Sequence, residues 1–258
     1  WDKSLIYDAN TNSSPLAACI NKDANGIFVI TKIGLQGTFL AKGSRCVLWE
    51  IRDDGQLTKQ PVLLRDGGGN MITTDALTFG YGCAMVADSN DNLLTVGMLG
   101  ARNNEISIAN ILTANVTKPK ILTRNPTYMH NIAKLMPFQN NTFILVGGRN
   151  GDGVLQQINN QGKILREDQF DNERNECFTG VDLINSNSSS LAVVGSSIKL
   201  ADANSADNFI LIYDPNYKII HEDWWKSSVS GFALVTARPK ICCLGDASIV
   251  VYNRESGN

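Results

Sequence analysis

The chain has 258 residues, of which 43% are hydrophobic, and a formal net charge of −2, so it is long and apolar enough to bury a large core. Its Lys and Arg residues form no cluster, which argues against nucleic acid or an anionic membrane as partner, and no apolar run is long enough for membrane insertion. The abundance of Asn, with 22 Gly and only 7 Pro, favours many short strands joined by tight turns.

Pairs of short apolar runs recur along the chain, each pair separated by a polar turn. This spacing of apolar run, turn and apolar run predicts β-hairpins. The second run of each pair ends in glycine in four of the five copies and in Thr31 in the first. The first runs are 16–20, 83–87, 132–136, 180–184 and 232–236, and the second runs are 27–31, 93–97, 143–147, 192–195 and 242–245.

A third apolar run follows each hairpin, and a fourth, more polar run follows in four of the five units. The polarity of the fourth run is typical of an outer edge strand, which proteins protect with charge. The fifth unit has no fourth run at the C-terminus, but residues 1–8 supply one when the chain is read circularly. The third runs are 45–51, 105–112, 154–158, 209–213 and 248–252, and the fourth runs are 57–64, 118–124, 163–170 and 218–225.

These repeats predict a single all-β domain, a five-bladed β-propeller with four antiparallel strands per blade, closed by an N-terminal outer strand. A β-sandwich or double sandwich is the alternative fold. The match between the missing fourth run of the last unit and the extra run at residues 1–8 favours the propeller. A solenoid or sandwich would not require such a match. The predicted blades cover residues 9–64, 79–125, 129–171, 177–227, and 230–258 together with 1–8.

Several fragments resemble kelch repeats of the β-propeller class. Gly147 and Gly148 form a double glycine at the end of a second run. The fourth unit has Tyr213 followed by the pair Trp224 and Trp225, while Tyr252 precedes Trp1 on circular reading. The resemblance implies the propeller fold and no specific activity.

Familiar catalytic and cofactor motifs are absent from the sequence, so we expect no cofactor and no metal. The glycine-rich stretch 149–153 is interpreted as a turn between strands rather than a phosphate cradle, and the fragments 23–26 and 88–91 lack the distal Glu of an EF-hand calcium loop. The six cysteines show no zinc or disulfide-framework spacing and are interpreted mainly as buried free thiols.

The longest connections, 32–44, 65–81 and 196–208, join second to third strands or one blade to the next, and in a propeller these connections share one face. Long loops on a rigid scaffold usually carry function, so this face is the predicted binding face. The candidate binding residues on it are Asn70, Asp75, Tyr81, His130, Asn131, Arg149, Glu176, Phe178, Lys199 and Phe232.

Two functions are compatible with this face. The first is a non-enzymatic binding or scaffold module that holds a protein partner or a glycan. The alternative is a glycoside hydrolase-like enzyme, as found among five-bladed propellers, in which Asp75 and Glu176 act as paired carboxylates in the central funnel. A funnel filled by aromatic side chains such as Phe178 and Phe232 would favour interaction alone.

The start at Trp1 and the Asn- and Ser-rich composition suggest an extracellular or periplasmic location. The sequence also has four sequons for N-glycosylation, a modification of secreted proteins. They begin at Asn12, Asn115, Asn140 and Asn187.

Overall fold

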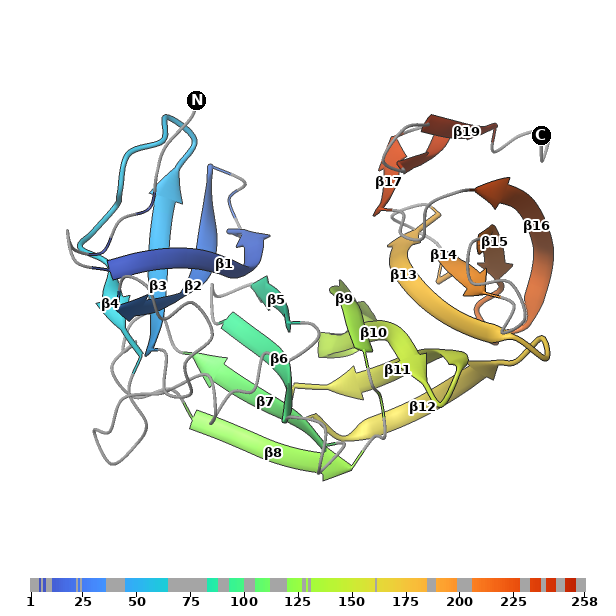
Figure 1. Cartoon of the computed structure of the whole chain (residues 1–258), viewed down its shortest axis with the longest axis horizontal. Coiled ribbons are helices and arrows are strands. Elements are labelled where there is room, and N and C mark those ends of the chain that lie inside the picture. The colour runs from blue at the N-terminus through green and yellow to red at the C-terminus, as the bar shows by residue number, and fades with distance from the viewer. Residues whose placement is uncertain are drawn as a thin grey trace. The chain divides into compact units, whose positions relative to one another are not determined.

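The computed structural model describes residues 5, 7, 11–21, 23, 25–35, 45–64, 83–87, 93–99, 105–111, 120–126, 129, 131–160, 162–184, 189–198, 206–227, 233–237, 240–244 and 249–253. Nearly all of them lie in β-strands or the turns between strands (Figure 1). The one helical element in these ranges is η2 (Gln139–Asn141), a single 3-10 turn. None of the described helices has the length and apolar character required to span a membrane.

The strands form five antiparallel sheets, and within each sheet consecutive strands of the chain are hydrogen-bonded neighbours. All five hairpins predicted from the sequence are present, as are the third and fourth runs. The first sheet contains β1 (Thr11–Ile20), β2 (Gly26–Leu35), β3 (Arg45–Arg52) and β4 (Val62–Leu63), and the second contains β5 (Cys83–Ala87), β6 (Leu93–Leu99), β7 (Glu105–Ile111) and β8 (Lys120–Pro126).

The chain divides into two compact units, and the remaining three sheets belong to the second of them. Unit 1 consists of residues 1–128 with 160–163, and unit 2 of residues 129–159 with 164–258. The third sheet contains β9 (Asn131–Phe138), β10 (Thr142–Arg149), β11 (Asp152–Asn159) and β12 (Ile164–Phe170). The fourth contains β13 (Asn175–Leu183), β14 (Leu191–Ile198), β15 (Ala206–Tyr213) and β16 (Ile219–Ser227), and the fifth β17 (Ala233–Ala237), β18 (Lys240–Leu244) and β19 (Ile249–Asn253).

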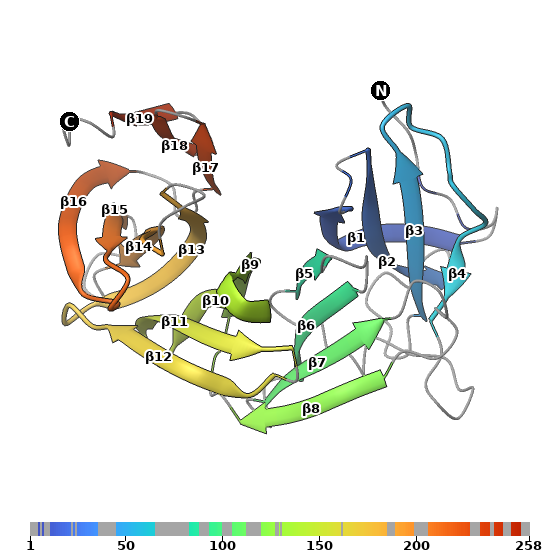
Figure 2. The ribbon, with the colours of Figure 1, turned by 180° about the vertical axis from the view of Figure 1, so that it is seen from behind.

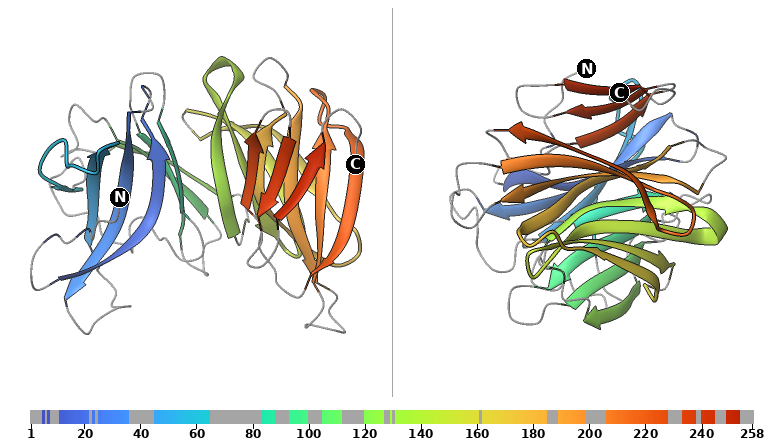
Figure 3. Two further views of the ribbon diagram at one scale, coloured as in Figure 1. Left: turned by 90° about the horizontal axis from the view of Figure 1, so that it is seen from above. Right: turned by 90° about the vertical axis from the view of Figure 1, so that its right-hand side faces the viewer.

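The sheets of unit 2 are stacked in chain order. Figure 2 shows the chain passing from the outer strand β12 of the third sheet to the inner strand β13 of the fourth. Both views in Figure 3 show the three-stranded fifth sheet stacked against the fourth. The fourth sheet therefore lies between two neighbours, and its strand β14 is buried on both faces, which explains why the apolar residues of β14 run continuously instead of alternating with polar ones.

The first sheet of unit 1 has two apolar faces. On one face Phe28, Ile30 and Leu48 are buried together with Met85 of β5 in the second sheet. On the other face lies a cluster of Val29, Ile33, Val47, Trp49 and Ile51, against which Leu5 and Tyr7 pack.

The outer strand β4 of the first sheet is much shorter than the predicted run 57–64. Its ladder with β3 contains only two residue pairs, and Leu57 contributes an isolated bridge to Ile51. Pro61 directly precedes β4 and has no backbone N–H to donate, so the ladder cannot continue through that position.

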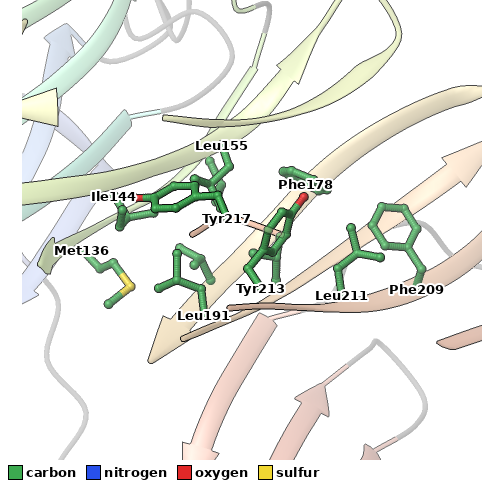
Figure 4. Close-up of a cluster of buried hydrophobic side chains, with 12 residues drawn as sticks. Met136, Ile144, Leu155, Phe178, Leu191, Phe209, Leu211, Tyr213 and Tyr217 are labelled. Atoms are coloured by element: carbon green, nitrogen blue, oxygen red, sulfur yellow. The ribbon is translucent and has the colours of Figure 1, made fainter. Parts of the chain in front are cut away.

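The largest buried cluster of unit 2 joins the third and fourth sheets (Figure 4). Ile144 and Leu155 from the third sheet meet Phe178, Leu191 and Leu211 from the fourth, all of them fully buried.

An aromatic group lies within this cluster. The Phe170 ring stacks on the Phe178 ring with centroids 6.1 Å apart, and the Phe209 ring meets Phe178 edge-on at 6.0 Å. The Trp224 ring lies 4.8 Å from that of Phe209. These side chains bury large apolar areas and hold the two sheets together.

Glycine in the middle of β14 is required by a close approach. A Cβ atom on Gly195 would lie 2.3 Å from Cζ of Phe209 and 2.6 Å from the carbonyl oxygen of Cys177. The recurrent glycine of the repeat is therefore explained in this sheet by packing against the neighbouring strands.

Three of the six cysteines have described side chains, and none of the three is in a disulfide. Cys46 is fully buried, and this burial raises the pKa of its thiol to about 12. Cys19 and Cys177 are half-buried. Cys46 is thus the one described cysteine that fits the expected fully buried thiol, while Cys83, Cys242 and Cys243 have side chains outside the described set.

Candidate functional site

Several connections between strands meet at one end of unit 2, whereas the long connections predicted to form the binding face, 32–44, 65–81 and 196–208, lie wholly or mostly outside the described residues. The β10–β11 turn, the β12–β13 connection and the end of β14 meet at this end of unit 2, and we name this region the loop end. The backbone N–H of Glu176 donates a hydrogen bond to the carbonyl of Gly151 at 2.5 Å. Gly151 has φ = +98°, and a Cβ atom on it would lie 2.6 Å from Oδ1 of Asn175. This turn therefore needs glycine both for its backbone angle and for its contact with the next sheet.

Three carboxylates gather at the loop end, and we name them the acidic cluster: Asp152, Asp171 and Glu176. One oxygen from each lies within 4.8 Å of the other two. Asp152 begins β11, Asp171 directly follows β12, and Glu176 is the second residue of β13. Asp152 and Asp171 lie in or directly after strands of the third sheet, and Glu176 lies in the fourth. The cluster therefore exists only because the ends of three strands from two sheets meet.

Glu176 is the buried member of the cluster, with 2% of its surface exposed. Its Oε1 accepts a hydrogen bond from Oγ of Ser197 at 3.0 Å, and its Oε2 lies 3.4 Å from the backbone N–H donor of Asn172. Burial raises the pKa of Glu176, and the nearby charges of Asp171 and Asp152 raise it further, against the lowering effect of these two donors. The site thus favours a proton on Glu176 relative to a solvated glutamate.

The other two members of the acidic cluster are more accessible. Asp171 is exposed, and its Oδ1 accepts the backbone N–H of Glu173 at 2.9 Å, in a turn where Glu173 has φ = +58°. Asp152 is half-buried and accepts a hydrogen bond from the side-chain amide of Gln169. Both carboxylates can therefore meet a ligand approaching from solvent.

The arginines of the loop end are paired with other carboxylates. Arg149 forms a bidentate ion pair with Glu167 and also donates to Oε1 of Gln169 at 3.0 Å. Burial acts to raise the pKa of Glu167, but hydrogen bonds from Arg149 and Gln156 outweigh it, so that the pKa lies below the ordinary glutamate value.

Arg174 forms the second pair of the loop end. Its Nη1 lies 2.6 Å from Oδ2 of Asp207, and its guanidinium lies 6.0 Å from the centre of the Trp224 ring. Among the described residues, no ion-pair partner is found for the acidic cluster itself.

The described residues place three of the predicted binding residues. Arg149 and Glu176 lie at the loop end. Phe178 differs from its predicted place at the rim, because its ring is fully buried between the third and fourth sheets. The backbone of Asn131 begins β9, and its side chain lies outside the described set.

The other predicted residues lie outside the described ranges: Asn70, Asp75, Tyr81, His130, Lys199 and Phe232. The proposed pairing of Asp75 with Glu176 therefore stays a prediction.

Sequence reasoning missed Asp152 and Asp171 as site residues. The stretch around Asp152 was interpreted as a turn, which is correct for its backbone but overlooks the carboxylate that the turn presents. A usable signal existed in the order of the chain, because both aspartates border strands at connections of the predicted binding face. Carboxylate oxygens are ligands that hard cations accept. Among the described residues, these three could therefore hold such an ion. The expected absence of a metal stays a prediction.

Comparison with known proteins identifies the class of fold but no family. No family model matches the chain, so the kelch-like resemblance gains no support from that comparison, and no curated protein matches it either. The chain is similar to a solved structure of the Dos1 propeller, with 13% identity and a TM-score of 0.50 over 95% of this chain and 56% of that one. It thus spans little more than half the length of that chain.

Two further solved structures resemble the chain with a TM-score of 0.53 each. One is a protein of unknown function from Dyadobacter fermentans, with 10% identity over 96% of this chain and 84% of that one. The other is a protein from Lactobacillus plantarum, with 12% identity over 95% and 69%. Together with the antiparallel sheets, these similarities support an all-β fold of the β-propeller class.

Proposed function

We propose that the five sheets are the five blades of one closed propeller domain, with residues 1–8 as the outer strand of the fifth blade. The fifth sheet has three described strands where the others have four. Leu5 and Tyr7, from the proposed closing strand, pack on an apolar face of the first sheet, which is the first blade in chain order. A closing strand makes such a contact because neighbouring blades of a propeller pack face to face.

Deletion of residues 1–8 tests this closure. We expect faster amide hydrogen exchange in β19, because that strand loses its outer hydrogen-bonding neighbour. The double variant Leu5→Ser, Tyr7→Ser is the matched control: it removes the apolar contact and keeps the backbone that pairs with β19. Unchanged protection of β19 in the deletion variant would exclude residues 1–8 as its partner.

We propose that the protein is a non-enzymatic binding module that uses the loop end for a protein partner. The observation that supports it is the acidic cluster, three carboxylates within 4.8 Å with no ion-pair partner among the described residues. Their mutual repulsion is relieved by a cation, and the basic side chain of a partner supplies one. Asp171 and Asp152 are accessible enough to meet it, and a loop end on a rigid sheet scaffold is a common place for such a contact.

A binding assay with a lysine-rich peptide library and an oligosaccharide panel tests this function. We expect salt-sensitive binding of basic peptides, weakened roughly threefold to tenfold by Asp171→Asn. The control is Asp53→Asn, because Asp53 is an exposed aspartate in the connection between β3 and β4 of unit 1. Binding of oligosaccharides alone would favour the glycan alternative, and no binding of either probe by correctly folded protein would overturn the proposal.

The glycoside hydrolase alternative is supported by one feature of the site, the raised pKa of Glu176. A general acid in a glycosidase needs such a raised pKa. The 2% exposure of Glu176 weighs against it, because a catalytic acid must reach the glycosidic oxygen. Turnover of aryl glycosides that is abolished in Glu176→Gln would establish the enzyme and replace the binding proposal.

We also propose that the protein functions outside the cytoplasm, in an extracellular or periplasmic setting. The support comes from composition and from the sequons. The sequon that begins at Asn140 lies between β9 and β10 of unit 2.

A further inference from the structure

We propose that Asn140 is an N-glycan acceptor that is modified before the β9–β10 hairpin closes. Asn140, Asn141 and Thr142 form an N-x-Thr sequon, the pattern recognised for transfer of an oligosaccharide to the Asn side chain. The proposal is independent of the binding function of the loop end, and it applies to the chain in a eukaryotic secretory pathway.

The folded structure can carry a glycan at Asn140. The residue lies in η2 between β9 and β10, is exposed, and has φ = 55° and ψ = 43°, a backbone conformation that asparagine tolerates in tight turns. The described residues include no hydrogen-bond partner for its side chain. A sugar on Nδ2 would therefore extend into solvent without breaking a contact.

The threonine of the sequon is in a different situation. Thr142 is 7% exposed, and its hydroxyl donates to the carbonyl of Gln139 at 2.7 Å and accepts from Nε2 of Gln157 at 2.9 Å. Thr142 is also paired with both Phe138 and Asn159 in the third sheet. A transferase that must read this hydroxyl cannot reach it in the folded hairpin, so the reaction has to precede folding.

The chemical step is balanced with one co-reactant, a lipid-linked oligosaccharyl pyrophosphate. The Nδ2 atom of Asn140 attacks C1 of the first sugar, and an N–C1 bond forms as the bond between C1 and the pyrophosphate oxygen breaks. The proton lost from the amide leaves with the lipid pyrophosphate group. No oxidation or reduction is involved.

The position of Asn140 leaves the loop end uncovered. The turn that holds it joins the end of β9 to the start of β10, whereas Arg149 and the β10–β11 turn lie at the other end of β10. Seven residue steps of about 3.3 Å separate Thr142 from Arg149, or about 23 Å along the strand.

The third residue of a second sequon lies at the same hairpin end. Nε2 of Gln139 donates to Oγ of Ser189 at 2.7 Å, and Ser189 is the third residue of the sequon that begins at position 187. A glycan on Asn140 would thus occupy the end of unit 2 that the binding proposal leaves free.

Expression of the full chain behind a cleavable leader in a eukaryotic secretory host tests the acceptor. We expect a glycopeptide containing Asn140 in the secreted protein, lost in Asn140→Gln and retained in Thr142→Ser, which keeps a hydroxyl in the sequon. Asn216→Gln is the control, because Asn216 is an exposed turn asparagine outside any sequon. Secreted protein in which Asn140 carries no glycan would overturn the proposal.

The timing is tested with a purified oligosaccharyltransferase in solution. We expect the enzyme to modify a synthetic peptide of residues 136–146 and to leave the folded, unglycosylated full chain unmodified. Equal modification of the two would show that the closed hairpin is itself a substrate and would overturn the proposed order. Neither result depends on whether the loop end binds a basic partner.

Discussion

At the scale of single residues, Glu176 is the member of the acidic cluster whose environment differs most from water. It lies almost fully buried, beside Asp152 and Asp171, and only Ser197 supplies a short side-chain hydrogen bond. These surroundings penalise its negative charge. Its protonation state should therefore couple to the stability of the fold.

We predict that Glu176 contributes a fall in protein stability as the pH rises above the ordinary glutamate range, and that Glu176→Gln removes this contribution. The pKa of Glu176 is raised above its ordinary value of 4.5, so the folded chain retains a proton that the unfolded chain has lost. The contribution of Glu176 is thus fully present below pH 4.5 and is lost as the pH rises through the raised pKa. Denaturant midpoints measured across this range check it.

The matched control for this pH dependence is Glu173→Gln, since Glu173 is exposed in the same connection. It should show the pH dependence of the parent protein. An unchanged pH profile in Glu176→Gln would contradict this contribution and leave other groups, such as Asp168, whose pKa burial also raises, as the cause of any fall.

At the scale of elements, the β2–β3 pair shows how one side chain replaces the recurrent glycine. The first unit has Thr31 at the position where the other four units have glycine. Its Oγ1 accepts a hydrogen bond from Nε1 of Trp49 at 2.8 Å, with both residues buried. The indole N–H is thereby satisfied inside an apolar face, as a buried donor requires.

We predict that Thr31→Val destabilises the protein by about 1–3 kcal/mol, although valine has nearly the same shape. The substitution leaves the indole N–H of Trp49 buried without an acceptor, and that desolvation cost is not recovered. Thr31→Ser keeps the hydroxyl and should lose less. Chemical denaturation of both variants measures the difference, and equal losses would show that the methyl group of Thr31 matters more than its hydroxyl.

At the scale of the whole molecule, the fold depends on sheets packing face to face. In unit 2 this packing is carried by the large cluster between the third and fourth sheets, with Phe178, Phe170 and Phe209 in mutual contact. A Cβ atom on Gly153 would lie 2.7 Å from the Phe178 ring, so the ring fills the available space closely. Loss of such a side chain should reduce stability throughout unit 2.

We predict that Phe178→Ala destabilises the protein by about 3–5 kcal/mol, the usual cost of removing a fully buried aromatic side chain. Phe178→Leu retains much of the volume and should cost less. Thermal and chemical unfolding with intrinsic fluorescence measure both. A loss below about 1 kcal/mol for the alanine variant would indicate that Phe178 is exposed at the rim, as first predicted from the sequence.

The sequence by itself determined the strands, the hairpins and the class of fold. Apolar runs of strand length and turns rich in Asn and Gly act locally, and Asn140, Asn141 and Asn150 adopt the positive φ angles that such turns require. These predictions succeeded because neighbouring residues alone decide them.

Only the tertiary structure decided which side chains meet. A register shift between Phe178 and Gly180 puts Phe178 and Val181 in the same buried cluster, although a regular strand alternates its faces every residue. The acidic cluster likewise needs the β10–β11 turn to touch the β12–β13 connection, a contact between two sheets. Bulges and contacts between sheets depend on packing energies summed over distant segments, and no local pattern in the chain records them.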